Sequence, residues 1–339
     1  MDQQKKKGYS KRLFVQVIFF GLILFIALSK SGYLPEIFGS ACLHGLCPFG
    51  GVVSVYQYFS EGTLVHKIRE SSFVLMYIVL FLTVLFGPVF CGWVCPLGSA
   101  QEWIGRIGAK IWKKKYNRFI PLEKDRYLRY LRYFVLVWVL YITAKTGVLM
   151  FEKVDPYYAL FHFWTNEVAP TALVVLAVTI LGALFVERPW CKYLCPFGAL
   201  LGLGNFIRIF KIRRNASACV ECRVCDRECP MNIEVSKTEI VYDHQCITCL
   251  KCTSEFAGPL KSIVSLSAKG PKKNLNISAL ILGSIILLVF LGGIILSSLL
   301  GHWETGNNEN RGKLRKNRQA EYHEKTLDIG TEQRAVELT

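Results

Sequence analysis

Long uncharged runs of mostly apolar residues set the pattern of the chain. A helix needs roughly 20 such residues to cross a bilayer core, and four runs come close to or exceed that length. A fifth contains only Lys145, near one end, where its side chain can reach the headgroups. The five runs are 13–29, 71–90, 133–151, 168–186 and 275–300. They predict five transmembrane helices.

Basic residues are unevenly distributed among the segments between these runs. The N-terminal segment and residues 91–130 are rich in lysine and arginine, whereas 152–167 contains only Lys153. Because cytoplasmic loops carry the excess of Lys and Arg, the two basic regions are expected in the cytoplasm. Alternation places 31–70, 152–167 and the C-terminal tail outside the membrane and 187–274 in the cytoplasm.

The first run has a second interpretation, a secretory signal, because basic residues precede it. No clear small-x-small cleavage site follows, which favours an uncleaved anchor. The tail is polar, with balanced charge and no apolar periodicity, and is expected to be disordered.

A short block occurs twice. The sequence FCGWVCPLG (90–98) ends the second run, and WCKYLCPFG (190–198) follows the fourth. We call these the twin blocks. Upstream of each, an outer loop carries a proline followed by an aromatic residue, at 48–49 and 156–157. Two parallel repeats predict a pseudo-twofold axis along the membrane normal.

Each twin block ends in Cys-Pro-x-Gly and is expected to begin a helix, because proline fits the first helical turn. Residues 97–113 place apolar side chains on one face and Glu102, Arg106 and Lys110 on the other. That pattern predicts an interfacial helix with these charges toward water. The second copy, 197–211, is more apolar and is expected to pack against the bundle.

Composition fits a membrane protein and directs attention to the cysteines. Of 339 residues, 52% are hydrophobic and 19% charged, so a wholly soluble enzyme is not expected. The basic excess lies beside the uncharged runs, so topology explains it better than nucleic-acid binding, and no nucleic-acid partner is expected. The 13 cysteines fall in closely spaced groups, which favours metal binding over disulfides.

The strongest chemical signal is Cys219-x2-Cys222-x2-Cys225-x3-Cys229-Pro230. This is the spacing of a bacterial ferredoxin, in which three cysteines bind one 4Fe-4S cluster and the fourth binds the other cluster of a pair. A structural zinc site is the alternative, but four cysteines so tightly spaced and ending in Cys-Pro suit cubanes better.

A second loop carries Cys246, Cys249 and Cys252. By the exchange of ligands between clusters, these three and Cys229 form one complete set. The other set, Cys219, Cys222 and Cys225, lacks a fourth cysteine, because Phe256 stands where it is expected.

Three solutions remain for that incomplete set: a three-iron cluster, an oxygen or nitrogen ligand from Ser254 or Glu255, or a cysteine from the membrane half. The cysteines of the membrane half are Cys91, Cys95, Cys191 and Cys195. These four are themselves candidates for a further cluster or for redox-active thiols, with buried free thiols as the alternative.

The outer loops offer weaker candidates. Cys42 and Cys47 are expected to form a small disulfide or to pack simply, with no metal assigned. The polar candidates for a quinone site are His44, Asp155, His162 and Glu167. No Gly-x-Gly-x2-Gly follows a strand, so nicotinamide binding is left to a partner.

The twin blocks CGWVCPLG and CKYLCPFG, followed by the loops CVECRVCDRECP and CITCLKC, resemble polyferredoxin-like membrane proteins, a family that includes NapH, the C-terminal half of NosR and CcoG. The resemblance covers roughly residues 13–300. It implies electron transfer at the cytoplasmic membrane through 4Fe-4S clusters. The missing fourth cysteine at Phe256 is a departure from the pattern.

The chain is therefore expected to pass electrons between cytoplasmic 4Fe-4S clusters and a quinone or an extracytoplasmic redox partner, as an electron-transfer component such as a quinol dehydrogenase subunit. The alternative is a redox-sensing or maturation factor for a respiratory metalloenzyme. A transporter is disfavoured because the runs lack the buried ionisable residues of transport sites.

The expected fold is an all-α integral membrane bundle of about five transmembrane helices in two parallel repeats, with a small inserted α+β ferredoxin-like 4Fe-4S domain on the cytoplasmic side. The expected segments are a basic cytoplasmic N-terminus (1–12), repeat 1 (13–115), repeat 2 (116–212), the ferredoxin-type domain (213–270), a C-terminal transmembrane helix (271–300) and the polar tail (301–339).

Overall fold

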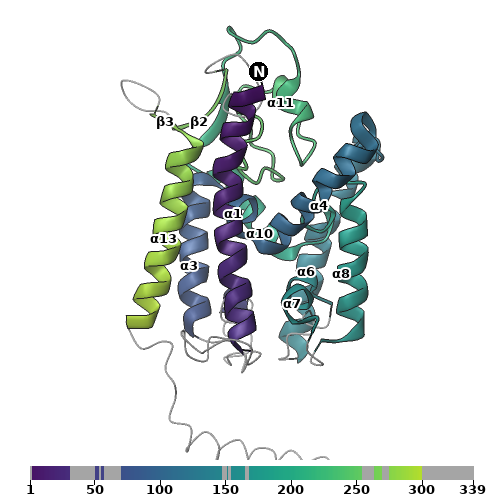
Figure 1. Cartoon of the computed structure of the whole chain (residues 1–339), viewed down its shortest axis with the longest axis vertical. Coiled ribbons are helices and arrows are strands. Elements are labelled where there is room, and N and C mark those ends of the chain that lie inside the picture. The colour runs from purple at the N-terminus through teal and green to yellow at the C-terminus, as the bar shows by residue number, and fades with distance from the viewer. Residues whose placement is uncertain are drawn as a thin grey trace, which may run out of the picture.

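The computed structural model describes residues 2–30, 50–52, 55–56, 70–146, 151, 154–164, 168–253, 263–268 and 275–299. In this part of the chain, long helices stand side by side, and a small sheet and cysteine-rich loops lie at one end of them (Figure 1). The long upright helices are α1 (Asp2–Lys30), α3 (Glu70–Phe86), α6 (Leu131–Thr146), α8 (Pro170–Ala183) and α13 (Ala279–Leu299). Each overlaps one of the five apolar runs of the sequence.

Length and composition distinguish α1 from the others. Within the described residues, its stretch Lys11–Leu28 is the one long and apolar enough to cross a membrane by these two measures. Shorter apolar helices lie at Val74–Phe86, Pro170–Ala183, Pro196–Ile207 and Ala279–Gly293. The bundle of about five transmembrane helices therefore stays a prediction.

Both twin blocks start a helix at their Cys-Pro pair, as the sequence predicts. After α3, one turn of π-helix, η2 (Phe90–Val94), leads to α4 (Pro96–Trp112). In the second repeat, the short helix α9 (Pro189–Tyr193) leads to α10 (Pro196–Ile207). In each case the second cysteine of the block is the N-cap residue and proline occupies the first helical position, where its missing N–H costs no hydrogen bond.

The helices that follow the blocks cross between repeats. Helix α4 packs on α1 and on α8, and α10 packs on α6 and on α3. Backbones approach closely at these crossings: a Cβ on Gly108 would lie 2.2 Å from the carbonyl oxygen of Leu184, and one on Gly204 would lie 2.4 Å from the Thr83 side chain. Glycine is therefore required for the helices to pack this closely.

Short elements complete the description. The turn η3 (Lys113–Lys115) and α5 (Leu122–Leu128) connect α4 to α6, and α7 (Pro156–His162) packs on α8. An antiparallel sheet with the order β1-β2-β3 joins β1 (Lys211–Arg214), β2 (Val264–Ala268) and β3 (Leu275–Ile277), with Ile212 opposite Leu266. The cysteine loops, with α11 (Val224–Arg227) and η5 (Val235–Lys237), lie between β1 and β2 in sequence.

Candidate metal centre

Four cysteines face one cavity. They are Cys229, Cys246, Cys249 and Cys252, each at most 8% exposed. The rest of the lining is almost entirely aliphatic, with Ile212, Met231, Ile233, Val235, Val241, Ile247 and Leu250. We call these four cysteines the buried set. It is the same set that the exchange of ligands between two ferredoxin loops predicts, so the structure brings together residues that the sequence had grouped.

Strained backbone shapes the second cysteine loop (246–252). Thr248 has φ 47° and Leu250 has φ 61°, in the left-handed region that β-branched and bulky residues avoid. Such conformations cost roughly 1–3 kcal/mol each and persist where their surroundings hold them. Here the Thr248 hydroxyl donates to the carbonyl oxygen of Phe86 at 2.9 Å. The indole N–H of Trp93 donates to the carbonyl oxygen of Thr248 at 3.0 Å. Contacts from α3 and the first twin block therefore hold the loop in place.

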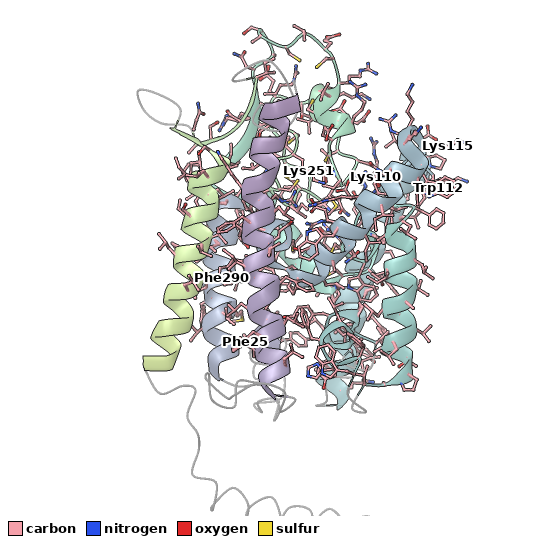
Figure 2. All side chains as sticks on the ribbon, in the orientation of Figure 1. Phe25, Lys110, Trp112, Lys115, Lys251 and Phe290 are labelled. Atoms are coloured by element: carbon pink, nitrogen blue, oxygen red, sulfur yellow. The ribbon has the colours of Figure 1, made fainter. Side chains whose placement is uncertain are left out.

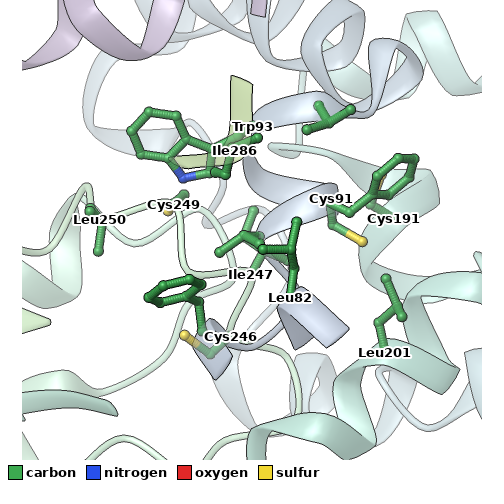
Figure 3. Packing of buried hydrophobic residues seen from close by; sticks show 14 of the residues in the cluster. Leu82, Cys91, Trp93, Cys191, Leu201, Cys246, Ile247, Cys249, Leu250 and Ile286 are labelled. Carbon is green, nitrogen blue, oxygen red and sulfur yellow. The ribbon is translucent and has the colours of Figure 1, made fainter. Parts of the chain in front are cut away.

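The first twin block lies directly against this loop. A Cβ on Gly92 would lie 2.4 Å from the carbonyl oxygen of Ile247 and 3.5 Å from the Cα of Cys249. Trp93 is fully buried and lies beside Cys249 in the packed interior (Figure 3). No sequence pattern predicts this contact, because 155 positions separate Trp93 from Thr248.

Buried positive charge surrounds the loop. Arg208 is 1% exposed, and its Nη1 donates to the sulfur of Cys246 at 3.6 Å. Burial raises the pKa of the Cys229, Cys249 and Cys252 thiols. A metal must therefore displace their protons to bind, and nearby cations favour the thiolates that result.

Glu102 is the centre of a buried ion-pair network. Its Oε2 lies 2.6 Å from both Arg12 Nη2 and Arg188 Nη2, and its Oε1 lies 3.2 Å from Lys251 Nζ. Figure 2 shows Lys251 between α1 and α4. Burial acts to raise the pKa of Glu102, but the charges of Arg12, Lys251 and Arg188 outweigh it and hold that pKa well below its usual range.

The expectation that Glu102 lies on the water-facing side of an interfacial helix is wrong. The side chain is 2% exposed, because α4 packs on α1 and α8 and turns this face inward. Sequence reasoning also missed the roles of Arg12 and Arg188, since basic residues next to apolar runs are typical of membrane topology.

The first cysteine loop (219–225) is far more open than the second. Cys222 is exposed, and Cys219 and Cys225 are partly buried. Hydrogen bonds from the backbone at Glu221 and from Arg214 lower the pKa of Cys219, whereas burial and the charge of Asp226 raise the pKa of Cys225 to about 11. The candidate fourth-ligand positions Ser254, Glu255 and Phe256 lie outside the described residues.

The four cysteines of the twin blocks also lie near one another. Burial, and after it the neighbouring Cys191 and Cys91, raise the pKa of both Cys95 and Cys195. Figure 3 shows the side chains of Cys91 and Cys191 close together. Two polar groups face these sulfurs: Gln101 Nε2 donates to Cys191 at 3.6 Å, and the Gly198 N–H donates to Cys195 at 3.3 Å.

The type and spacing of the ligand atoms decide whether a single metal ion or an iron–sulfur cluster could bind. Across the described ranges, no three His, Cys, Asp or Glu side chains are arranged to hold a single metal ion. A cubane separates its ligand sulfurs more widely than one ion does. Four thiols around an aliphatic cavity, with Arg208 beside one of them, fit a 4Fe-4S cluster.

The other residues that the sequence analysis named have structural roles or lie outside the described residues. Asp155 caps α7, with its Oδ1 accepting from the N–H of Tyr157 at 3.0 Å. His162 is 4% exposed and stacks on Tyr158 at 4.1 Å between ring centroids. His44, Glu167, Cys42 and Cys47 lie outside the described residues.

Comparison with known proteins adds independent evidence. A family model described as a 4Fe-4S binding domain matches residues 70–115 and 168–215. These two segments contain one twin block each, so the double match reflects the internal repeat.

Several curated relatives cover most of the same region. The chain is 28% identical over 266 residues to YccM of Escherichia coli, named as a candidate electron transport protein, with 77% of this chain and 72% of YccM covered. It is 32% identical over 210 residues to the uncharacterized protein MJ0750 of Methanocaldococcus jannaschii, covering 62% and 82%. It is 31% identical over 186 residues to the ferredoxin-type protein NapH of Haemophilus influenzae, covering 52% and 61%. No solved structure matches the chain.

Proposed function

Because this chain belongs to the polyferredoxin-like family of 4Fe-4S electron-transport proteins, we propose that it carries electrons between clusters in its cytoplasmic segment and a quinone or extracytoplasmic partner. Members of this family share iron–sulfur electron transfer. The membrane location, the cluster ligands and the redox partner of this chain are proposed here from its own residues.

The observation that carries the proposal is the cavity lined by the buried set. Cys229, Cys246, Cys249 and Cys252 would bind one 4Fe-4S cluster, which supplies one-electron transfer when bound. The aliphatic lining would exclude water, and Arg208 would offset negative charge at Cys246. Cluster potential depends on exposure, net charge and hydrogen bonds to sulfur, and this chain controls all three at the cavity.

A second cluster would bind at the first cysteine loop. Cys219, Cys222 and Cys225 would supply three ligands, and Ser254, Glu255 or a cysteine of the membrane half would complete the set. The exposure of Cys222 supports access by a redox partner, which we propose to be cytoplasmic.

The twin-block cysteines would extend the path toward the membrane. Cys91, Cys95, Cys191 and Cys195 have mutually interacting sulfurs, and the block that carries the first two lies against Ile247 and Cys249. We include them as a further redox site, either a cluster or a set of redox-active thiols.

The proposed setting is the cytoplasmic membrane, with the five long helices spanning it. Large apolar side chains point outward on each of these helices. Examples are Phe14 at 65% exposed, Phe81 at 60%, Phe134 at 69%, Val178 at 63% and Leu288 at 70%. Exposed apolar surface of this extent suits contact with lipid.

The test is anaerobic purification, followed by electron paramagnetic resonance (EPR) during reduction with dithionite and reoxidation with a quinone analogue. We expect reducible clusters that are reoxidised by the quinone. Clusters that no quinone reoxidises would contradict the quinone route and favour the redox-sensing or maturation role. The exposed first cysteine loop is the feature that favours that second candidate.

A further inference from the structure

Arg208 is fixed against one thiol of the buried set. It follows α10, is 1% exposed, and is held at both ends of its guanidinium. Nη1 donates to Cys246 Sγ at 3.6 Å and to Thr248 Oγ1 at 3.0 Å, while Nη2 donates to the carbonyl oxygen of Val241 at 2.6 Å. The charge therefore has little freedom to move away from the sulfur.

The charge of Arg208 is also uncompensated. Within the described residues no carboxylate pairs with it, whereas the nearby buried Lys192 pairs with Asp125 at 2.9 Å and Lys251 pairs with Glu102. An arginine stays protonated at any physiological pH. The cavity thus has a full positive charge at Cys246.

The first cysteine loop carries charges of both signs. The sulfur of Cys225 lies 3.8 Å from Asp226 Oδ1, whereas Arg214 hydrogen-bonds to Cys219. Because Cys222 is exposed, water screens these charges. At the buried set, the interaction with Arg208 is strengthened by its low-dielectric surroundings.

We propose that Arg208 raises the reduction potential of the cluster bound by the buried set above that of the cluster bound by the first cysteine loop, so that electrons move inward from the exposed loop. The inference rests on the proposed function. Reduction adds one negative charge to a cluster, and a cationic N–H donor to its sulfur stabilises the reduced form more than the oxidised form.

The electron balance is simple. A low-potential one-electron carrier would give one electron to a cluster held by the first cysteine loop. That electron would then pass to a cluster held by the buried set, so that the first cluster would be reoxidised by one electron as the second is reduced by one. No bond of the chain forms or breaks. Arg208 is a positioning residue, because it acts through Cys246 and not on the carrier.

The experiment is an EPR-monitored redox titration of the full chain, purified anaerobically. In the unmodified protein, we expect the signal that is lost in Cys229→Ser to titrate at the higher potential. Arg208→Gln removes the charge, and we expect the one-electron reduction constant of that signal to fall at least tenfold, about 59 mV. The other signal should not move. Arg208→Lys keeps the charge and should recover part of the loss.

A matched control lies at the other loop. Arg214 hydrogen-bonds to Cys219, so Arg214→Gln should lower the potential of the other signal alone. The inference is overturned if Arg208→Gln leaves both potentials unchanged or shifts only the wrong one. It is also overturned if the signal of the buried set titrates lower than the other signal in the unmodified protein. Absence of reducible clusters would instead contradict the proposed function itself.

Discussion

Gly92 shows how one residue joins the two halves of the molecule. Its missing side chain lets the first twin block lie against the backbone of Ile247 and Cys249. The spacing of the cysteines predicts a metal site but not the residues that pack against it. The glycine of CGWVC is replaced by Lys192 in CKYLC. The contact with the second cysteine loop explains why the first block has glycine at this position.

We predict that Gly92→Ala will destabilise the protein. The added Cβ would lie 2.4 Å from the Ile247 oxygen, and overpacking of this kind costs about 1–3 kcal/mol. Thermal unfolding in detergent and iron content measure the effect, and both should fall. Gly21→Ala is the control, because a Cβ there meets nothing within 4 Å and alanine favours a helix. Equal behaviour of the two variants would contradict the contact.

A second prediction at this scale concerns Glu102→Gln. The change leaves Arg12, Arg188 and Lys251 without their shared carboxylate, and breaking a buried ion pair in this way costs about 3–5 kcal/mol. The pKa of Glu102 is held well below its usual range. Its contribution is therefore fully present above the unfolded pKa of about 4.3 and is lost as pH falls through the folded value.

Unfolding temperatures measured against pH check this prediction. The difference between the unmodified protein and Glu102→Gln should be constant from neutral pH to about 5 and shrink in stronger acid. The exposed Glu123 supplies the control, since Glu123→Gln should change little. A difference that grows as the pH falls would contradict the sign.

The networks around Glu102 and Arg208 could not be predicted from the sequence, whereas the buried set could. Ligand exchange between ferredoxin loops is encoded in short spacings, so Cys229, Cys246 and their neighbours could be grouped by counting. Glu102 is 86 positions from Arg188. A charge on a helix surface is normally solvated, and only the packing of α4 shows that this one is buried.

At the scale of elements, local chemistry predicted where helices begin but not how they cross. The start of α4 and of α10 at Cys-Pro follows from the fixed φ of proline. The π-helical turn η2, and the packing of α4 on α8 and of α10 on α3, depend on contacts between repeats. The apolar periodicity of α4 therefore led to the wrong prediction that Glu102 faces water.

The two cysteine loops give a prediction at this scale. Because Cys229 follows the first loop in sequence but faces the cavity of the second, Cys229→Ser should remove the inner cluster and spare the other. Cys222→Ser should do the reverse. EPR spectra of the reduced variants report which signal is lost. Loss of the same signal in both variants would contradict the exchange of ligands.

At the scale of the whole molecule, the course of α13 bears on topology. This helix begins beside the small sheet, runs past α3 and α1, and ends at the far end of the bundle (Figure 1). The expected topology puts the first end in the cytoplasm and the residues after α13 outside. The apolar runs located the long helices, and the number of these helices that cross the membrane stays a prediction.

We predict that a protease added outside intact cells will remove a tag at the C-terminus and leave one at the N-terminus. The basic segment at Lys113–Lys115 should be cut only after the cells are opened. Immunoblotting of both tags reads the result. Simultaneous protection or simultaneous cleavage of the two tags would contradict an odd number of spans.

Chemical analysis of the anaerobically purified full chain for iron and acid-labile sulfide shows directly whether the chain binds clusters. Clusters at the two cysteine loops predict at least about eight iron atoms and as many sulfides per chain, with EPR signals that develop on reduction. A colourless protein without sulfide would contradict the claim that the thiols of the buried set bind a cluster.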